Sequence, residues 1–265
     1  MNSVALNFGA FLALLPAAAV SFRRQGGRDA IFYGVLALAV LGPGLWVLAQ
    51  TGGPWHTGFA MSLWLTIAAT MALFLTLSLA TRHAWQLAPL LLPYLVLLGI
   101  AALVWQHAPE RPVAEAVPVG WLDTHIVLAI ATYGLLTIGA VAGLAVFLQE
   151  RALKAKRPTM LTRLLPAVAE SEALEVRLLA GAEAVLALGL ASGMAAQHFL
   201  GGRLLPFDHK TLFSLAAFAV IGILLVARYR WGMRGRRAAR LALLAYLLLT
   251  LAYPGVKFVQ DVLIA

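Results

Sequence analysis

The hydrophobic positions of this chain form long, nearly continuous runs, separated by short polar connections. About 20 consecutive apolar residues are needed for a helix to cross a bilayer. We predict a membrane-spanning helix in each of eight such runs, at about 3–22, 30–50, 59–81, 85–105, 122–149, 174–198, 210–228 and 238–260. The predicted fold class is therefore all-α: a polytopic integral membrane protein whose residues 1–265 form a single membrane domain, with antiparallel neighbouring helices.

Two parts of this pattern are irregular. The fourth run contains Pro89 and Pro93, and we predict that they kink or break its helix, because proline removes a backbone donor that neighbouring helices must then compensate. The connection 150–177 is long enough for two helical pieces separated around Pro166. Two roles stay open for this connection: lying on the membrane surface, or docking a partner protein.

Lysine and arginine are distributed unevenly between the two sides of the predicted bundle. One set of alternate connections holds 16 of the 20 basic residues, namely 23–29, 82–84, 150–177 and 228–240. Cytoplasmic loops of membrane proteins are enriched in these residues. We therefore predict that these connections are cytoplasmic and that both termini lie on the non-cytoplasmic side.

Composition supports a membrane protein and excludes several classes of site. The chain is 62% hydrophobic and 12% charged, about half the charged fraction of a soluble domain. It has no cysteine, which excludes disulfides, iron–sulfur clusters and thioether-linked haem. The basic run RYRWGMRGRR adjoins a predicted span, where anionic lipid attracts positive charge. We therefore expect a lipid bilayer and no nucleic acid as its partner.

Five of the six histidines fall on the predicted non-cytoplasmic side: His56, His107, His125, His198 and His209. Their spacing matches no zinc motif. His125 and His209 differ from the others because each opens a long apolar helix and closely follows an acid, in WLDTH and FDH. Asp123 and Asp208 can cap these helices or orient the imidazoles.

Two interpretations of these histidines remain open from the pattern. In one, they are solvated residues at capped helix ends. In the other, His125 and His209 are the metal ligands of a haem, whose propionates pair with Lys210 or Arg203. Trp121, four residues before His125, can then form a wall of the haem site.

The remaining polar and small residues predict structure more than chemistry. Glu183 is expected to be a structural ion-pair or hydrogen-bond partner near Arg177. The small residues of AVAGLAV and GLASG predict close helix packing. No nucleophile–base–acid set or phosphate loop occurs, so enzyme activity is not predicted. A transporter is disfavoured because no internal repeat is evident.

The second half of the chain resembles the cytochrome c assembly family, which contains the haem-handling CcmC and CcsA proteins. The resemblance covers about 118–265 and includes WLDTHIVLAIATYGLLTIGAVAGLAVFLQERALK and DHKTLFSLAAFAVIGILLVARYRWGMRGRRAA. Its distinguishing residues are His125 with Tyr133, Gln149 with Glu150, and the Gly-Arg-Arg that follows the seventh span. The eight spans resemble the HemX-like, or YpjD-like, branch.

The sequence also departs from the haem-handling members of that family. Their tryptophan-rich external segment ends in Trp-Asp-Pro-Lys, where this chain has Phe207-Asp208-His209-Lys210. Their second external histidine, near the end of the last span, has no counterpart in YPGVKFVQDVLIA. His209 is the replacement ligand that we propose from the sequence.

The resemblance implies a haem-handling protein of the bacterial inner (plasma) membrane that assists cytochrome c maturation. It would bind haem b at its outer face through His125 and His209, with Asp208, Lys210 and Trp121 beside the cofactor. The alternative is a non-catalytic scaffold or regulator of haem biosynthesis, which would contact a haem-synthesis protein through 150–177.

Overall fold

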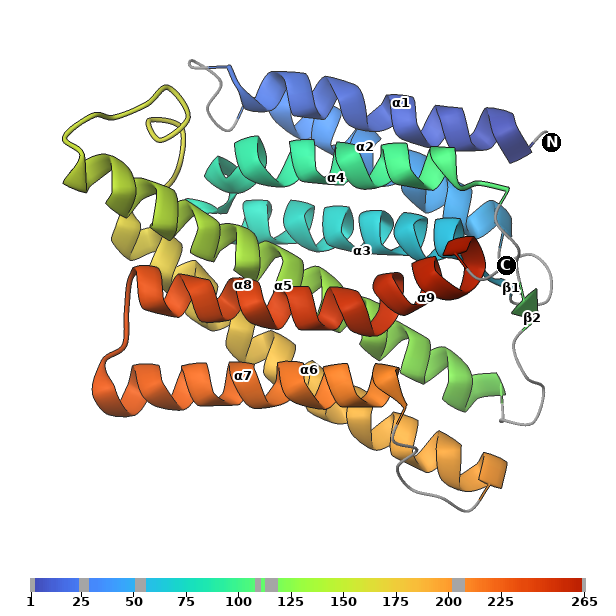
Figure 1. Cartoon of the computed structure of the whole chain (residues 1–265). Coiled ribbons are helices and arrows are strands. Elements are labelled where there is room, and N and C mark those ends of the chain that lie inside the picture. The colour runs from blue at the N-terminus through green and yellow to red at the C-terminus, as the bar shows by residue number, and fades with distance from the viewer. Residues whose placement is uncertain are drawn as a thin grey trace.

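The computed structural model describes residues 3–23, 29–50, 56–107, 111–112, 119–201 and 208–263, which form a bundle of long helices (Figure 1). The first half contains α1 (Ser3–Ser21), α2 (Ala30–Gln50), α3 (Phe59–Ala80), the 3₁₀ turn η1 (Ala84–Leu87) and α4 (Ala88–Val104). The second half contains α5 (Val119–Lys154), α6 (Val168–Gly201), α7 (His209–Trp231), α8 (Arg236–Thr250), a π-helical segment (Leu251–Gly255), α9 (Val256–Phe258) and a second π-helical segment (Val259–Leu263).

Eight helices of the described chain are long and apolar enough to cross a membrane, which confirms the eight predicted spans. The fifth and sixth are longer than predicted, because they cover Gly120–Lys154 and Val168–His198. Hydropathy indicates where a helix leaves the apolar layer, whereas the helix continues as long as its backbone remains hydrogen-bonded. The chain is therefore a multi-pass membrane protein, and most of 150–177 consists of the ends of two long helices.

Successive helices run in opposite directions, so the connections alternate between the two ends of the bundle. Figure 1 shows the turns α3–α4, α5–α6 and α7–α8 at one end, and both chain termini at the other. We call these the basic end and the terminal end. At the terminal end two short strands pair antiparallel, β1 (His56–Thr57) with β2 (Arg111–Pro112). The predicted clustering of Lys and Arg thus falls on one end of the fold.

The prolines of the fourth span do not break its helix. Pro89 lies in the first turn of α4, where the missing N–H costs nothing, and η1 precedes it. Pro93 lies inside α4, which continues to Val104. The expectation of a break was therefore wrong, because Pro89 occupies a permitted position and the helix backbone continues past Pro93.

Helix α5 joins two apolar cores. One core contains buried residues of α1–α4 together with Ile138, Val141 and Ala142 of α5. The other contains Tyr133 and Leu136 of the same helix, with buried residues of α6, α7 and α8. Because α5 packs against α3, α6 and α8, the position of its side chains is fixed from several directions.

The turn between α5 and α6 is held by Gln149. Its amide nitrogen donates to the carbonyl oxygens of Thr162 at 2.8 Å, Pro166 at 3.0 Å and Leu165 at 3.3 Å. A side-chain amide nitrogen carries two hydrogens, so the three carbonyl oxygens share these two donated hydrogens. The turn therefore folds back onto the end of α5, with α6 starting two residues after Pro166.

Buried charges fix the α7–α8 turn against α6. The Glu172 carboxylate accepts from the Gly235 N–H at 2.8 Å and lies 3.4 Å from a guanidinium nitrogen of Arg228. Glu175 lies 3.9 Å from the same guanidinium. Nothing in the sequence indicates that Glu172 and Glu175 face an arginine of α7. This cluster joins three helices at the basic end.

Replacing Glu172 by alanine should lower the free energy of unfolding by about 2–4 kcal/mol, because it removes the nearer of the two carboxylates that face the buried Arg228 charge and leaves the Gly235 N–H without its acceptor. Only 11% of the Glu172 side chain and 13% of the Arg228 side chain are exposed. The matched control is Glu170→Ala, which breaks the half-exposed His83–Glu170 pair and should cost less than about 1 kcal/mol. Unfolding by SDS in mixed micelles measures both. Equal losses in the two variants would contradict the assigned role of Glu172.

Candidate functional site

His125 lies in the first turns of α5 at the terminal end and contacts α6. Its Nδ1 is 2.8 Å from the Ser192 hydroxyl oxygen. That hydroxyl lies 2.9 Å from the Gly189 carbonyl, and when it donates its single hydrogen there it accepts from His125. In this arrangement Nδ1 carries the ring hydrogen, and Nε2 keeps its lone pair. A neutral imidazole in this tautomer is the form that binds a metal through Nε2.

Two further contacts restrict the position of the imidazole. A Cβ atom at Gly193 would make a tight contact of 3.1 Å with Cε1 of His125, so glycine leaves room for the ring beside α6. Trp121, one turn earlier on α5, donates from its indole nitrogen to the Ser192 carbonyl at 3.0 Å. The GLASG segment, which the sequence assigned to helix packing, thus also supports the imidazole.

Trp121 keeps 40% of its surface exposed even though its indole nitrogen is bonded. An indole fixed at its polar edge leaves its apolar face available to a flat hydrophobic ligand. The residue therefore fits the predicted role of a wall beside His125.

Lys210 and Asp208 lie at the start of α7. Asp208 is the N-cap and accepts from the Thr211 N–H at 2.8 Å, as predicted from FDH. The small degree of burial opposes its ionisation, but the Thr211 hydrogen bonds and the charges of Lys210 and His209 hold the pKa of Asp208 below its usual value of 3.8. Its carboxylate thus stays charged and keeps the cap over the whole neutral range.

The Lys210 ammonium lies 5.5 Å from the centre of the Tyr253 ring, a cation–π distance. Tyr253 belongs to the π-helical segment Leu251–Gly255, which contains Pro254. Lys210 is also near enough to His125 for its charge to act on the imidazole. The structure therefore brings together Trp121, His125 and Lys210 from two helices that are far apart in the sequence.

His209, the other predicted ligand, is the first residue of α7 and is exposed. Within the described ranges, no hydrogen bond joins it to His125, and no group of three or more His, Asp or Glu side chains gathers as a metal site. Arg203, a predicted propionate partner, lies outside the described residues. Its part in the site stays a prediction.

Two other sequence expectations need correction. Asp123 does not cap α5, because the helix already begins at Val119 and includes Asp123 in its second turn. No ion pair in the described part of the chain links Glu183 to Arg177, which is exposed. Glu183 instead faces α7, where a Cβ atom at Gly222 would lie 3.0 Å from its carboxylate oxygen.

A buried tyrosine cluster, which the sequence analysis did not identify, lies between α4, α5 and α8. The Tyr246 hydroxyl is hydrogen-bonded to those of Tyr94 and Tyr133, and the Tyr133 hydroxyl lies 3.0 Å from the Thr250 hydroxyl. Tyr133 is two helical turns after His125. Three aromatic residues separated by up to 152 positions carry no local pattern that could have grouped them. The cluster satisfies its own polar groups inside the apolar bundle.

The contacts at the terminal end suit one kind of ligand chemistry. They combine a neutral imidazole with a free Nε2, an indole face and an ammonium group held at a helix start. A planar, apolar metal macrocycle with carboxylate side chains needs these three features: an axial nitrogen ligand, an apolar wall and a cation.

Comparison with known proteins gives a family and two relatives. The family described as cytochrome C assembly protein matches residues 31–264. An "uncharacterized 28.8 kDa protein in nifR3-like 5'region" of Azospirillum brasilense is 55% identical over 268 aligned positions, which cover 99% of each chain. Protein HemX of Brevibacillus brevis is 28% identical over 184 positions, which cover 68% of this chain and 67% of that protein.

Proposed function

Because the chain belongs to the cytochrome c assembly family, we propose that it is a haem-binding membrane protein that assists cytochrome c maturation, with haem b at its terminal end. The observation that supports this most directly is the His125–Ser192 contact, in which an imidazole that donates from Nδ1 would keep the lone pair of Nε2 for iron. The distant similarity to Protein HemX is consistent with the HemX-like branch.

In this proposal, each residue of the site has a distinct role. His125 and the exposed His209 would bind the iron, and Trp121 would lie against the macrocycle. Lys210 would pair with a propionate, while Asp208 holds the start of α7 that carries Lys210. The bound group would supply a redox-active iron; the protein would supply orientation, exclusion of water and charge balance.

The proposed topology follows from the distribution of charge. The basic end lies in the cytoplasm, and the terminal end with both termini lies outside, as the enrichment of Lys and Arg at one end suggests. Haem would then be held at the outer face of the bacterial inner membrane, where cytochrome c receives it.

Absorption spectra of the purified full-length protein, reconstituted with haem in mild detergent, test the axial ligand. We expect a Soret band whose intensity falls at least about tenfold in His125→Ala, because the iron loses its fixed ligand. His198→Ala, an exposed histidine on α6 near the same end, is the matched control and should keep the band. Protein that stays colourless after reconstitution with haem would contradict haem binding. The alternative function, a scaffold or regulator of haem biosynthesis, would then be favoured.

Ser192→Ala tests how the imidazole is held. It removes the acceptor of the Nδ1 hydrogen, and loss of such a supporting contact typically lowers metal affinity by about 10–100-fold. Ser214→Ala is the control, because the Ser214 hydroxyl donates to a carbonyl of its own helix, that of Lys210, at 2.9 Å. Haem titration followed at the Soret band gives both affinities. An unchanged affinity in Ser192→Ala would mean that the hydroxyl does not orient the ligand.

A further inference from the structure

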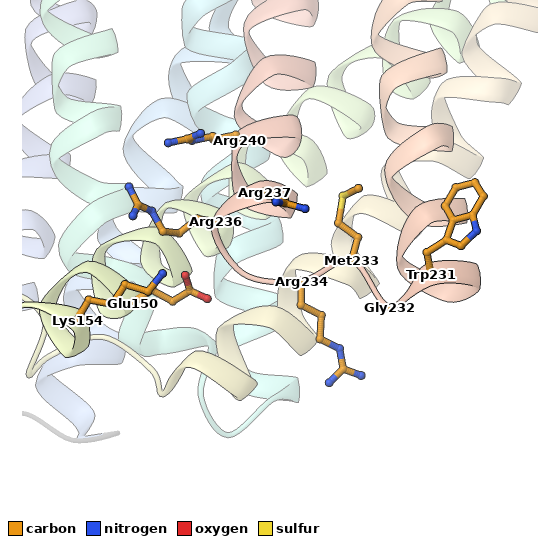
Figure 2. A pocket seen from close by; sticks show the side chains of 9 residues that line it. All are labelled: Glu150, Lys154, Trp231, Gly232, Met233, Arg234, Arg236, Arg237 and Arg240. Carbon is orange, nitrogen blue, oxygen red and sulfur yellow. The ribbon is translucent and has the colours of Figure 1, made fainter.

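A cleft lies at the basic end, opposite the proposed haem site. It has a volume of about 640 Å³ and lies between the end of α5 and the α7–α8 turn (Figure 2). The residues that line it are Glu150, Lys154, Trp231, Gly232, Met233, Arg234, Arg236, Arg237 and Arg240. Its volume is within the range of small-ligand sites, so it can hold more than a bare ion.

The charge of this cleft is strongly positive and largely uncompensated. Five of its side chains are cationic and one is a carboxylate. None of the five takes part in an ion pair with another described residue, whereas neighbouring Arg228 is bound to Glu172 and Glu175. Cationic side chains that line one cleft repel one another, and this repulsion destabilises the fold unless an anion binds between them. The cleft therefore has the electrostatic character of an anion site.

The backbone that carries these arginines is held rigidly. Gly232 ends α7 in the left-handed region with φ 65°, and Gly235 precedes α8 with φ 64° and ψ −143°, a conformation that only glycine adopts readily. The Gly235 N–H is bonded to Glu172 at 2.8 Å. A Cβ atom at Gly235 would overlap a Glu150 carboxylate oxygen, so the turn also packs against α5.

This turn aims the start of α8 at the cleft. The N-cap Gly235 has no side chain to bond the first-turn N–H groups, and the Glu150 carboxylate lies beside it. The positive end of the helix dipole therefore faces the cleft and favours negative charge there. Arg236 is held over the Phe147 ring at 4.9 Å. The site thus combines arginine side chains, a helix start and a fixed cavity.

The surroundings of the cleft favour a ligand from the membrane over one from water. Tyr229 and Trp231, at the end of α7, expose 75% and 74% of their surfaces, as aromatic residues do at the boundary between bilayer and water. Arg240 lies one turn inside α8, on an exposed face of a membrane-spanning helix. The cationic side chains thus extend from the end of the bundle toward the lipid.

We propose that this cleft binds the phosphodiester headgroup of an anionic phospholipid. The arginines and the α8 start would hold the phosphate, with Arg guanidinium groups donating in pairs to its oxygens. The Glu150 carboxylate would accept a hydrogen bond from a headgroup hydroxyl, a group that phosphatidylglycerol carries. A zwitterionic choline headgroup fits less well, because its cation would face the same arginines.

The test is a titration of the full-length protein in mild detergent with phosphatidylglycerol, phosphatidylcholine and sodium pyrophosphate, followed by microscale thermophoresis. Arg237→Gln with Arg240→Gln removes two exposed cations of the cleft and should weaken phosphatidylglycerol binding at least about tenfold. The control is Arg163→Gln with Arg230→Gln, which removes the same charge from exposed positions outside the cleft. It should weaken binding less than about threefold.

Each outcome decides between the possible sources of binding. Equal weakening in the two double variants would overturn the site in favour of diffuse attraction to the basic end. Equal affinity for phosphatidylcholine would overturn the anionic selectivity. Pyrophosphate binding that is lost in the cleft variant, without phosphatidylglycerol binding, would overturn the lipid assignment and indicate a soluble phosphate ligand. Size-exclusion profiles that match the parent protein establish that both variants fold.

Discussion

The antiparallel pairing of α5 with α6 determines the geometry at both ends of the molecule. At the terminal end, Ser192 of α6 fixes the ring of His125 on α5. At the basic end, Gln149 of α5 folds the connecting turn onto the helix pair. A small rotation of either helix would disturb both ends, because the pair packs along its full length. The proposed haem ligand therefore depends on the packing of the whole helix pair.

Polar side chains inside the bundle hold its parts together in two places. The Tyr94–Tyr246–Tyr133 cluster joins α4 of the first half to α5 and α8 of the second. The Glu172–Arg228 pair joins α6 to α7. Apolar helix faces gain little from contact with one another in lipid, because the alternative is contact with lipid tails. Directional bonds of this kind therefore specify which helices are neighbours.

Those parts of the structure that depend on local sequence could be predicted. The spans follow from hydropathy, the clustering of charge at one end follows from alternate connections, and the Asp208 cap follows from its place before an apolar run. The same reasoning allowed two roles for Asp123, capping the helix or orienting the imidazole. The capping role was wrong, because α5 begins earlier, at Val119, where hydropathy gives no signal.

Features that depend on contacts between distant segments could not be predicted. A serine in GLASG looks like a packing residue until α6 is placed beside His125, 67 positions earlier. Glu172 and Arg228 are separated by 56 positions, and the arginines of the cleft look like a solvated run until the turn that carries them is fixed. The sequence therefore names candidate ligands, which stay predictions, but it does not indicate Ser192 and Gly193, which hold the His125 ring.

The central claim is that Ser192 fixes the His125 imidazole with hydrogen on Nδ1 and a free Nε2. Nitrogen-15 NMR of imidazole-labelled, haem-free protein measures this directly, with His125→Gln assigning the resonance. The account predicts a protonated Nδ1 and an unprotonated Nε2 for His125. Hydrogen on Nε2, with Nδ1 accepting from Ser192, would contradict it.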